Sequence, residues 1–203
     1  DASLLNKDTG GVKNLDELKE RFSAESPDER RVKLLPFLTT VIEKQGVLIG
    51  NPETGPVVRV SNKRNFSYPG YNELLLGRPD DRIDSNDKVP NPNVTVLEWL
   101  NGREGLKGRV AGFGSWDVFP YIINEERSGV PVNAGWEPFT EASTPAALER
   151  LNRLCGEFGH YWDNVRYDYL TYQGALEYLA AKKPRVMYIS LGETDDWAHA
   201  RRY

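Results

Sequence analysis

The segment "RVMYISL", residues 185–191, is an almost unbroken apolar run between a Lys-Lys-Pro-Arg turn and a glycine. Its length and composition predict a β-strand, and its lack of alternation predicts that helices cover both faces. A long amphipathic helix is predicted just before it, at residues 164–183, and a second strand at 109–113. Strands that alternate with long helices favour an α/β fold, in which helices flank a central, largely parallel or mixed sheet.

The rest of the chain supplies further elements around this sheet. Ser26, Pro27 and Glu29 form a capping box with proline at the first helical position, and Pro36 predicts a kink before this helix ends at Gly46. Residues 78–93 are rich in turn-forming residues and exceed a routine connection, so they are a candidate functional loop. The other predicted helices are 14–22, 67–76, 94–101, about 116–124 and 144–155, with short strands at 47–50, at 57–60 and within 127–135.

Composition limits the classes of function. The 203 residues are enough for a single domain, expected to span residues 1–203, and the net charge of −4 gives no electrostatic case for a nucleic-acid-binding patch. No apolar segment is long enough to span a membrane. Cys155 is the only cysteine, which excludes an internal disulfide and thiolate zinc sites; its helical spacing from Leu148 and Leu151 places it in a core.

Acidic and imidazole side chains gather directly after the 185–191 strand, in "GETDDWAH". In open α/β sheets ligands bind beyond the carboxyl ends of the strands. If a helix begins at Thr194, Asp195 and His199 lie four residues apart on one face and suit a single cation, zinc before manganese or iron. The alternative interpretation is that Thr194 caps the helix, while the acids favour its positive end and His199 pairs with Asp195.

Ser67 in "NFSYPGYNELLLG" also has two interpretations. As a helix cap its hydroxyl would accept a hydrogen bond from a backbone N–H of the first turn. As a nucleophile it would stand where the positive end of the helix can hold a phosphoryl oxygen. Because the geometry serves both roles, the sequence leaves both open.

These two motifs in this order resemble the alkaline phosphatase superfamily, in particular its sulfatase-like and type I phosphodiesterase/nucleotide pyrophosphatase-like branches. In that family a nucleophile begins a helix in a pattern like T-x-P-x-x-x-x-L-x-x-G, matched here by Ser67, Pro69, Leu74 and Gly77. An Asp-x-x-x-His pair that binds a metal is matched by Asp195 and His199. The resemblance extends over nearly the whole chain.

The resemblance implies hydrolysis of phosphate mono- or diesters with two divalent metal ions, zinc or manganese. Ser67 would attack phosphorus and form a phosphoserine, Asp195 and His199 would hold one metal together with Ser67, and Asn86 would bind a phosphate oxygen. Asn86 is equally a turn residue. Members of this branch are often exported, so a periplasmic or extracellular location is expected.

The sequence also departs from the family pattern. Tyr71 stands where sulfatases carry an arginine, which argues against a sulfuric ester hydrolase, although that activity stays a further alternative. The Asp-His-Gly motif and the strand-borne aspartate that bind the second metal are missing, and the remaining histidine, His160, is expected at a helix end or on a packed surface. We therefore expect an internal piece of a larger catalytic domain.

A non-catalytic binding module is the second hypothesis. In it the aromatic residues of "GHYWDNVRYDYLTY", residues 159–172, would form a carbohydrate or partner surface, and the piece would be inactive. Aromatic residues at helical spacing are more often core than a ligand platform. Substrate identity and oligomeric state stay open.

Overall fold

The computed structural model describes residues 14–50 and 55–200. Two compact units divide the chain: unit 1 takes the residues up to Arg59 and those from Trp197 onward, and unit 2 is Val60–Asp196. None of the described helices is both long enough and apolar enough to span a membrane.

Unit 1 is helical in its described part. Its elements are α2 (Leu15–Phe22), α3 (Pro27–Leu34), the π-helix η1 (Leu38–Ile42) and α4 (Glu43–Gln45). Ser26 and Glu29 form the predicted capping box, with bonds of 3.2 and 3.1 Å. The predicted break at Pro36 is confirmed, because α3 ends at Leu34 and a π-helix follows.

The strands predicted at 47–50 and 57–60 are wrong. Neither segment forms a strand, and the turn residues 51–54 between them lie outside the described residues. The side chains of Val47, Val58 and Val60 are 66–78% exposed. A short apolar run becomes a strand only where a partner strand satisfies its backbone groups, and the described residues offer none here.

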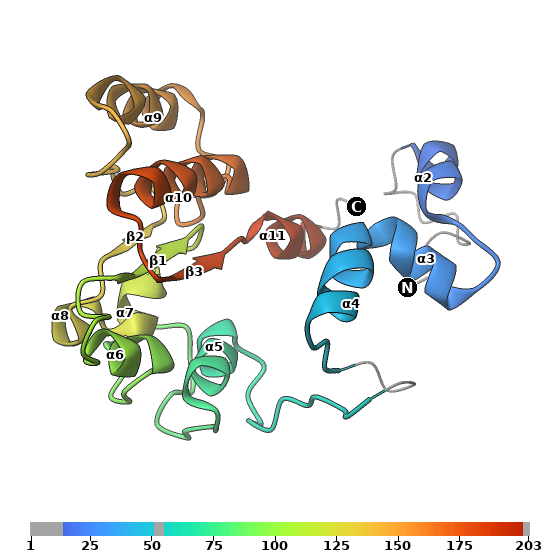
Figure 1. Ribbon diagram of the computed structural model, residues 1–203, viewed down its shortest axis with the longest axis horizontal. Coiled ribbons are helices and arrows are strands. Elements are labelled where there is room, and N and C mark those ends of the chain that lie inside the picture. The colour runs from blue at the N-terminus through green and yellow to red at the C-terminus, as the bar shows by residue number, and fades with distance from the viewer. Residues whose placement is uncertain (1–13, 51–54, 201–203) are drawn as a thin grey trace. The chain divides into compact units, whose positions relative to one another are not determined.

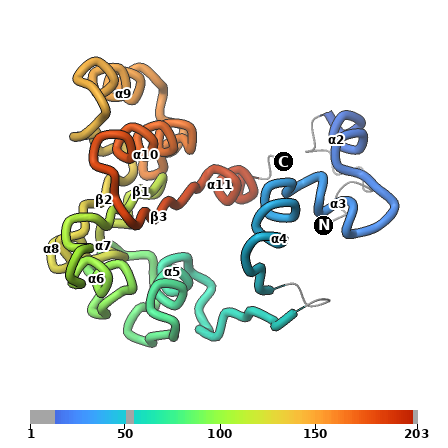
Figure 2. The backbone as a smooth tube through the Cα atoms, viewed as in Figure 1, coloured from blue at the N-terminus to red at the C-terminus, as the bar shows by residue number. Residues whose placement is uncertain are grey.

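Unit 2 is a three-layer α/β structure (Figure 1), which confirms the predicted fold class in its coarse form. The sheet contains β1 (Val110–Gly114), β2 (Val132–Ala134) and β3 (Val186–Ser190) in the order β2-β1-β3, and both pairs are parallel. One layer holds α9 and α10, and the other holds α5 to α8 (Figure 2). Its helices are α5 (Ser67–Leu76), α6 (Val96–Asn101), α7 (Phe119–Ile123), α8 (Glu125–Ser128), α9 (Pro145–Glu157) and α10 (Asp168–Lys182). Helix α11 (Glu193–His199) begins in unit 2, and its residues from Trp197 onward belong to unit 1.

The central strand β1 divides the core in two. Val110 packs with the α5–α8 layer, whereas Ala111 and Phe113 pack with α9 and α10, around the buried Cys155. Gly114 faces α7, and a Cβ there would lie 2.3 Å from the Phe119 ring. The absence of side chains at Gly112 and Gly114 therefore brings α7 directly onto this face of the sheet.

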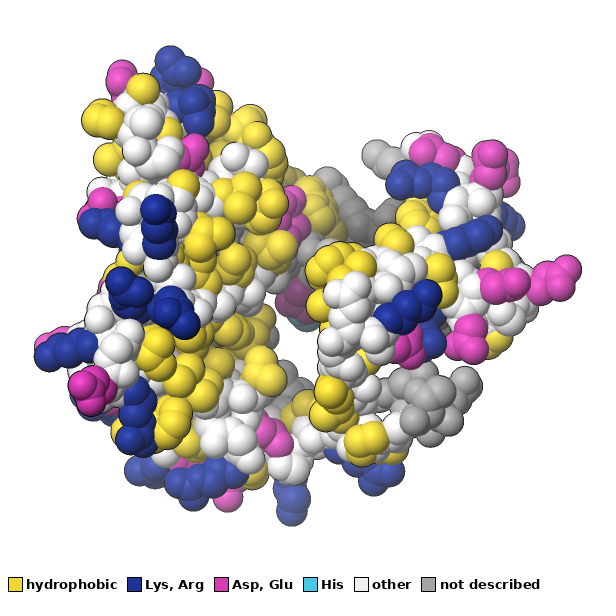
Figure 3. Space-filling model, viewed as in Figure 1, with side chains coloured by type: hydrophobic (Ala, Val, Ile, Leu, Met, Phe, Trp, Pro, Cys, Tyr) yellow, Lys and Arg dark blue, Asp and Glu magenta, His cyan; other side chains and the backbone are white. Residues whose placement is uncertain are grey.

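The prediction that helices cover both faces of β3 is only half right. β3 is an edge strand whose residues are half-buried, apart from the buried Ser190, and Ile189 is 42% exposed. The neighbouring outer face of α10 is also apolar, and Figure 3 shows hydrophobic side chains across this side of unit 2. An apolar run thus predicts a strand in a parallel sheet but not its place in the strand order.

Candidate functional site

The carboxyl ends of β1 and β3 meet and fix the position of the site. One residue beyond β1, the Ser115 N–H donates to the Ser190 carbonyl at 2.9 Å. Both serines are buried, and the chain leaves the sheet immediately after each of them. Ligands bind at this end of parallel sheets because loops and helix N-termini converge there.

Helix α5 presents Ser67 at its first position. The N-cap is Phe66, in extended conformation, and no side chain caps the helix from that position. Ser67 is exposed, and its hydroxyl makes no hydrogen bond within the described residues. The cap interpretation of Ser67 is therefore wrong, and its hydroxyl is open to another partner.

Asn86 contacts the first turn of α5. Its side-chain oxygen accepts the backbone N–H of Tyr68 at 2.9 Å, so the 78–93 loop closes over the mouth of α5. The next residue, Pro69, has no N–H, so the N–H of Ser67 is the donor that the first three residues of the helix leave available. The structure shows a capping role for Asn86, and its phosphate-binding role stays a prediction.

Tyr71 connects α5 to the sheet. It lies four residues after Ser67, on the same face of the helix, and its hydroxyl accepts a hydrogen bond of 3.2 Å from Ser190 Oγ at the end of β3. Its ring also packs edge-on against Phe119 with centroids 4.9 Å apart. The residue that stands in place of the sulfatase arginine thus fastens the Ser67 helix to the strand that leads into α11.

Helix α11 carries Asp195 and His199, both exposed and four residues apart. The helix begins at Glu193, and the Gly192 carbonyl accepts the N–H groups of Asp195 and Asp196 at 3.0 and 3.1 Å. Thr194 lies inside the first turn, so its predicted capping role is wrong.

One carboxylate and one imidazole suit zinc in donor chemistry. Within residues 14–50 and 55–200, no three His, Cys, Asp or Glu side chains form a group that could hold a metal. The described residues thus offer two protein donors of a predicted site, and the pairing of Asp195 and His199 on a cation stays a prediction.

A further contact holds the 78–93 loop against β1. Lys88 Nζ lies 2.6 Å from the carboxylate of Asp117, three residues past the strand, and this hydrogen bond raises the pKa of Lys88. No pattern in the sequence pairs these two residues, which are 29 positions apart. The contact leaves a Lys-Asp pair at the same end of the sheet as Ser115 and Ser190.

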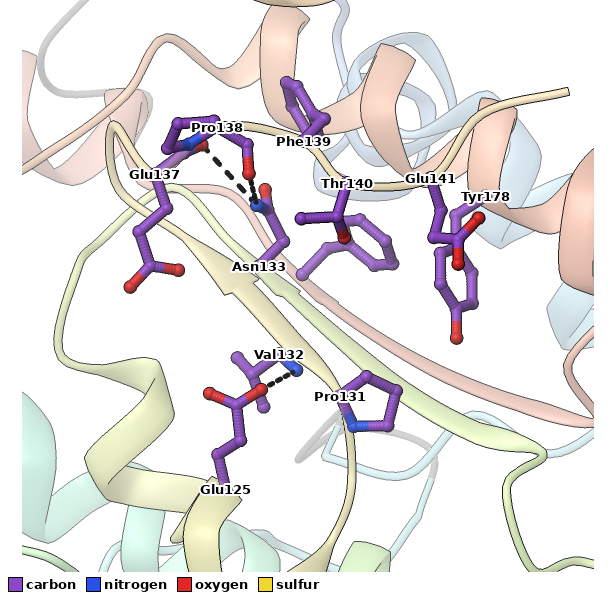
Figure 4. A pocket seen from close by; sticks show the side chains of 11 residues that line it. Glu125, Pro131, Val132, Asn133, Glu137, Pro138, Phe139, Thr140, Glu141 and Tyr178 are labelled. Atoms are coloured by element: carbon purple, nitrogen blue, oxygen red, sulfur yellow. Dashed lines mark hydrogen bonds between the residues drawn. The ribbon is translucent and has the colours of Figure 1, made fainter. Parts of the chain in front are cut away.

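Two of the pockets that the described residues form lie in unit 2. One, of about 270 Å³, is enclosed by the 82–92 part of the loop and by Tyr68, the neighbour of Ser67. The other, of about 230 Å³, borders β2 and holds none of the predicted site residues (Figure 4). There Glu125 accepts the Val132 N–H at 2.9 Å, and burial raises its pKa.

The aromatic residues of the binding-module hypothesis pack mainly on one another. His160 stacks on Trp136 at 3.6 Å with an 8° interplanar angle, which confirms its prediction as a packed residue. Trp136 Nε1 donates to the Trp162 carbonyl at 2.8 Å, and the Tyr167 hydroxyl donates to the Gly159 carbonyl at 2.8 Å. Intramolecular contacts thus occupy much of this cluster.

Comparison of the chain with protein-family models, with curated proteins and with solved structures gives no match. The resemblance to the alkaline phosphatase superfamily therefore stays a prediction from the sequence. Any assignment of function depends on the geometry described above.

Proposed function

We propose that this chain contributes the nucleophile and one metal-ligand pair to a phosphoric ester hydrolase that acts through a phosphoserine. The observation that carries the proposal is the Tyr71–Ser190 hydrogen bond. It joins the helix that begins at Ser67 to the end of β3, and α11 begins three residues after Ser190. Ser67 and Asp195 thus come from two helix N-termini at one end of the sheet.

The residues of the chain support an in-line attack by Ser67. Its hydroxyl is exposed and makes no hydrogen bond to any described residue, and its own N–H lies at the N-terminus of the helix, where the helix dipole favours a phosphoryl oxygen. Asn86 is held beside it through the Tyr68 N–H, so its side-chain amide NH₂ is available as a second donor to the phosphoryl group.

Asp195 and His199 would hold a divalent cation, zinc or manganese, by carboxylate oxygen and imidazole nitrogen. Such an ion, when bound, supplies charge neutralisation at phosphoryl oxygens and eases deprotonation of the nucleophile. The pocket of the 82–92 loop lies next to the Ser67 helix and is the candidate site for the leaving group.

Ser67→Ala tests the proposal cleanly. Because Ser67 caps nothing and is exposed, the variant should fold like the parent. With zinc or manganese present, we expect hydrolysis of an aryl phosphate and an aryl phosphodiester to fall by roughly 10³-fold or more. Ser23→Ala, at an exposed serine of unit 1, is the control and should keep its activity. Equal turnover in the Ser67 variant and the parent would remove Ser67 from the mechanism.

Metal content separates this proposal from a non-catalytic binding module. Elemental analysis of the purified chain, compared with an Asp195→Asn, His199→Ala double variant, should show zinc or manganese in the parent alone. No metal in either protein would favour the binding module.

A further inference from the structure

Two helix N-termini meet beyond β3 and cap each other. Asp168 begins α10, and its carboxylate accepts the N–H groups of Gly192 at 2.7 Å and Glu193 at 3.1 Å. Glu193 begins α11, and its carboxylate accepts the N–H of Asp168 at 2.7 Å. Each helix thereby receives from the other the negative charge and the acceptor that its N-terminus requires.

The Asp168 carboxylate is also the end of a buried hydrogen-bond chain. Arg166 Nε donates to Thr171 Oγ1 at 3.1 Å, Thr171 Oγ1 lies 2.9 Å from Ser115 Oγ, and Ser115 Oγ donates to Asp168 Oδ1 at 2.7 Å. Since Ser115 donates its only hydroxyl proton to Asp168, Thr171 must be the donor in the bond between the two hydroxyls. In all three of these hydrogen bonds the donor therefore lies on the Arg166 side and the acceptor on the Asp168 side.

The charge of Arg166 is the physical reason for this chain of hydrogen bonds. The arginine is fully buried, and within the described residues its guanidinium bonds no carboxylate: Nη1 donates to Asn133 Oδ1 at 2.8 Å and to the Glu137 carbonyl at 3.3 Å, and Nη2 has no partner. Burial lowers its pKa to about 10, so the group stays charged at neutral pH. A buried positive charge is costly unless polar groups or a negative charge compensate it. The aligned hydroxyls of Thr171 and Ser115 connect the charge of Arg166 to the carboxylate of Asp168 through a low-dielectric interior.

We propose that Asp168 is the positioning residue for the first turn of α11, and that the buried chain Arg166–Thr171–Ser115 fixes the orientation of its carboxylate. The consequence for chemistry rests on the proposed function, because the turn that Asp168 holds carries Asp195 and leads to His199. Asp168 acts through backbone N–H groups and is not itself a ligand of substrate or metal. The strand end, α10 and α11 are thus coupled at one carboxylate.

Hydrogen exchange on the full chain without metal tests the positioning role directly. In Asp168→Asn, one of the two acceptor oxygens becomes an NH₂ that cannot accept an N–H, so we expect the amide of Gly192 or of Glu193, whichever faces the NH₂, to exchange roughly tenfold faster. The matched control is Glu177→Gln on the same helix, whose carboxylate accepts the N–H and hydroxyl of Ser143. It should loosen Ser143 and leave residues 192–196 unchanged. Unchanged exchange at both Gly192 and Glu193 in the Asp168 variant would overturn the proposal.

A pair of substitutions at Thr171 tests the buried chain. Thr171→Val keeps the shape and removes the hydroxyl, whereas Thr171→Ser keeps the hydroxyl, so only the valine variant should speed exchange at Gly192, by several-fold. Should the valine variant fail to fold, Ser115→Ala removes the neighbouring link and must give the same increase. Equal exchange at Gly192 in the valine and serine variants would show that the buried hydrogen bonds do not orient Asp168.

Metal affinity links the positioning role to the proposed function. Titration of the full chain with zinc or manganese should give about tenfold weaker binding in Asp168→Asn and parent-like binding in Glu177→Gln, since groups that orient a ligand typically affect affinity by this amount. Equal affinity in the parent and Asp168→Asn would contradict the coupling to the metal pair. A parent that binds no metal would contradict the proposed function, while the exchange experiments would still judge the role of Asp168.

Discussion

At the start of α5, Asn86 caps the helix and Ser67 carries the unbonded hydroxyl. The asparagine, 18 residues further along the chain, accepts the N–H of Tyr68, and the serine hydroxyl is left unbonded within the described residues. A helix that receives its cap from a distant loop can carry a reactive side chain at its first position. This arrangement makes stability and reactivity separable by mutation.

Asn86→Ala should therefore destabilise unit 2, whereas Ser67→Ala should not. Loss of a capping acceptor typically costs ~1 kcal/mol, and exposed positions without such a bond change stability by about 0.5 kcal/mol or less. Urea denaturation followed by tryptophan fluorescence measures both. A larger loss of stability in the serine variant than in the asparagine variant would contradict this division.

The carboxylate of Glu73 makes hydrogen bonds whose contribution to stability depends on pH. Its carboxylate accepts the hydroxyl and N–H of Ser61 and the N–H and side chain of Asn62, and the Ser61 hydroxyl above all lowers the pKa of Glu73 to about 2. A carboxyl whose folded pKa lies below its usual 4.5 contributes stability above pH 4.5 and loses it as the pH falls towards 2. The contact holds the segment before α5 against that helix.

We expect Glu73→Gln to be less stable than the parent at pH 7 and nearly equal to it at pH 2.5. The comparison of urea midpoints at the two pH values measures this, because the glutamine has no proton to gain. A difference between parent and variant that does not shrink at low pH would show that the carboxylate is not the source of the stability.

At the scale of elements, close packing depends on glycine where α10 meets the segment before α9. A Cβ on Gly174 would lie 1.9 Å from the Phe139 ring, the ring on which the Arg166 guanidinium also stacks at 4.4 Å. Gly156 in α9 has no heavy atom within 4 Å of the same position. Substitution by alanine should therefore change stability differently at these two helical glycines.

Gly174→Ala should destabilise unit 2 by about 1–3 kcal/mol, because the added methyl group forces Phe139 to move. Gly156→Ala should instead be neutral or stabilising by about 0.5–1 kcal/mol, as expected for alanine in a helix. Thermal unfolding monitored by circular dichroism distinguishes the two. Similar melting temperatures for both variants would contradict the packing at Gly174.

The apolar segments 47–50 and 57–60 show how an element can be mispredicted. Their composition is typical of strands, yet their side chains are largely exposed and no ladder forms in the described part of the chain. The "RVMYISL" strand forms because β1 satisfies its backbone from Val110 to Gly114. The same local preference therefore had two outcomes, decided by whether a partner strand was present.

At the scale of the whole molecule, both hydrophobic cores belong to unit 2. The described helices of unit 1 bury no apolar side chain, and Thr39 is the buried residue there. The buried apolar residues begin at Tyr68 and end at Ala175. The described residues before Val60 therefore contribute no buried side chain to the two cores.

A chain that begins at Val60 should unfold cooperatively, within about 1 kcal/mol of the stability of the full chain. All five tryptophans lie after this point, and four of them, Trp99, Trp116, Trp136 and Trp162, lie in unit 2, so the fluorescence reports mainly on that unit in both proteins. Loss of the cooperative transition in the shorter chain would show that the first 59 residues are required for the fold of unit 2.

The sequence by itself determined what neighbouring residues decide: the capping box of α3, the end of α5 at Gly77, the Thr144 cap of α9 and the α/β class. These features involve groups within a turn or two of each other, so composition and spacing suffice. Tertiary structure alone decided that Asn86 caps α5, that Tyr71 bonds Ser190, and that Asp168 and Glu193 cap each other's helices. Their partners lie 18, 119 and 25 residues apart, and only packing on the sheet brings such side chains into contact.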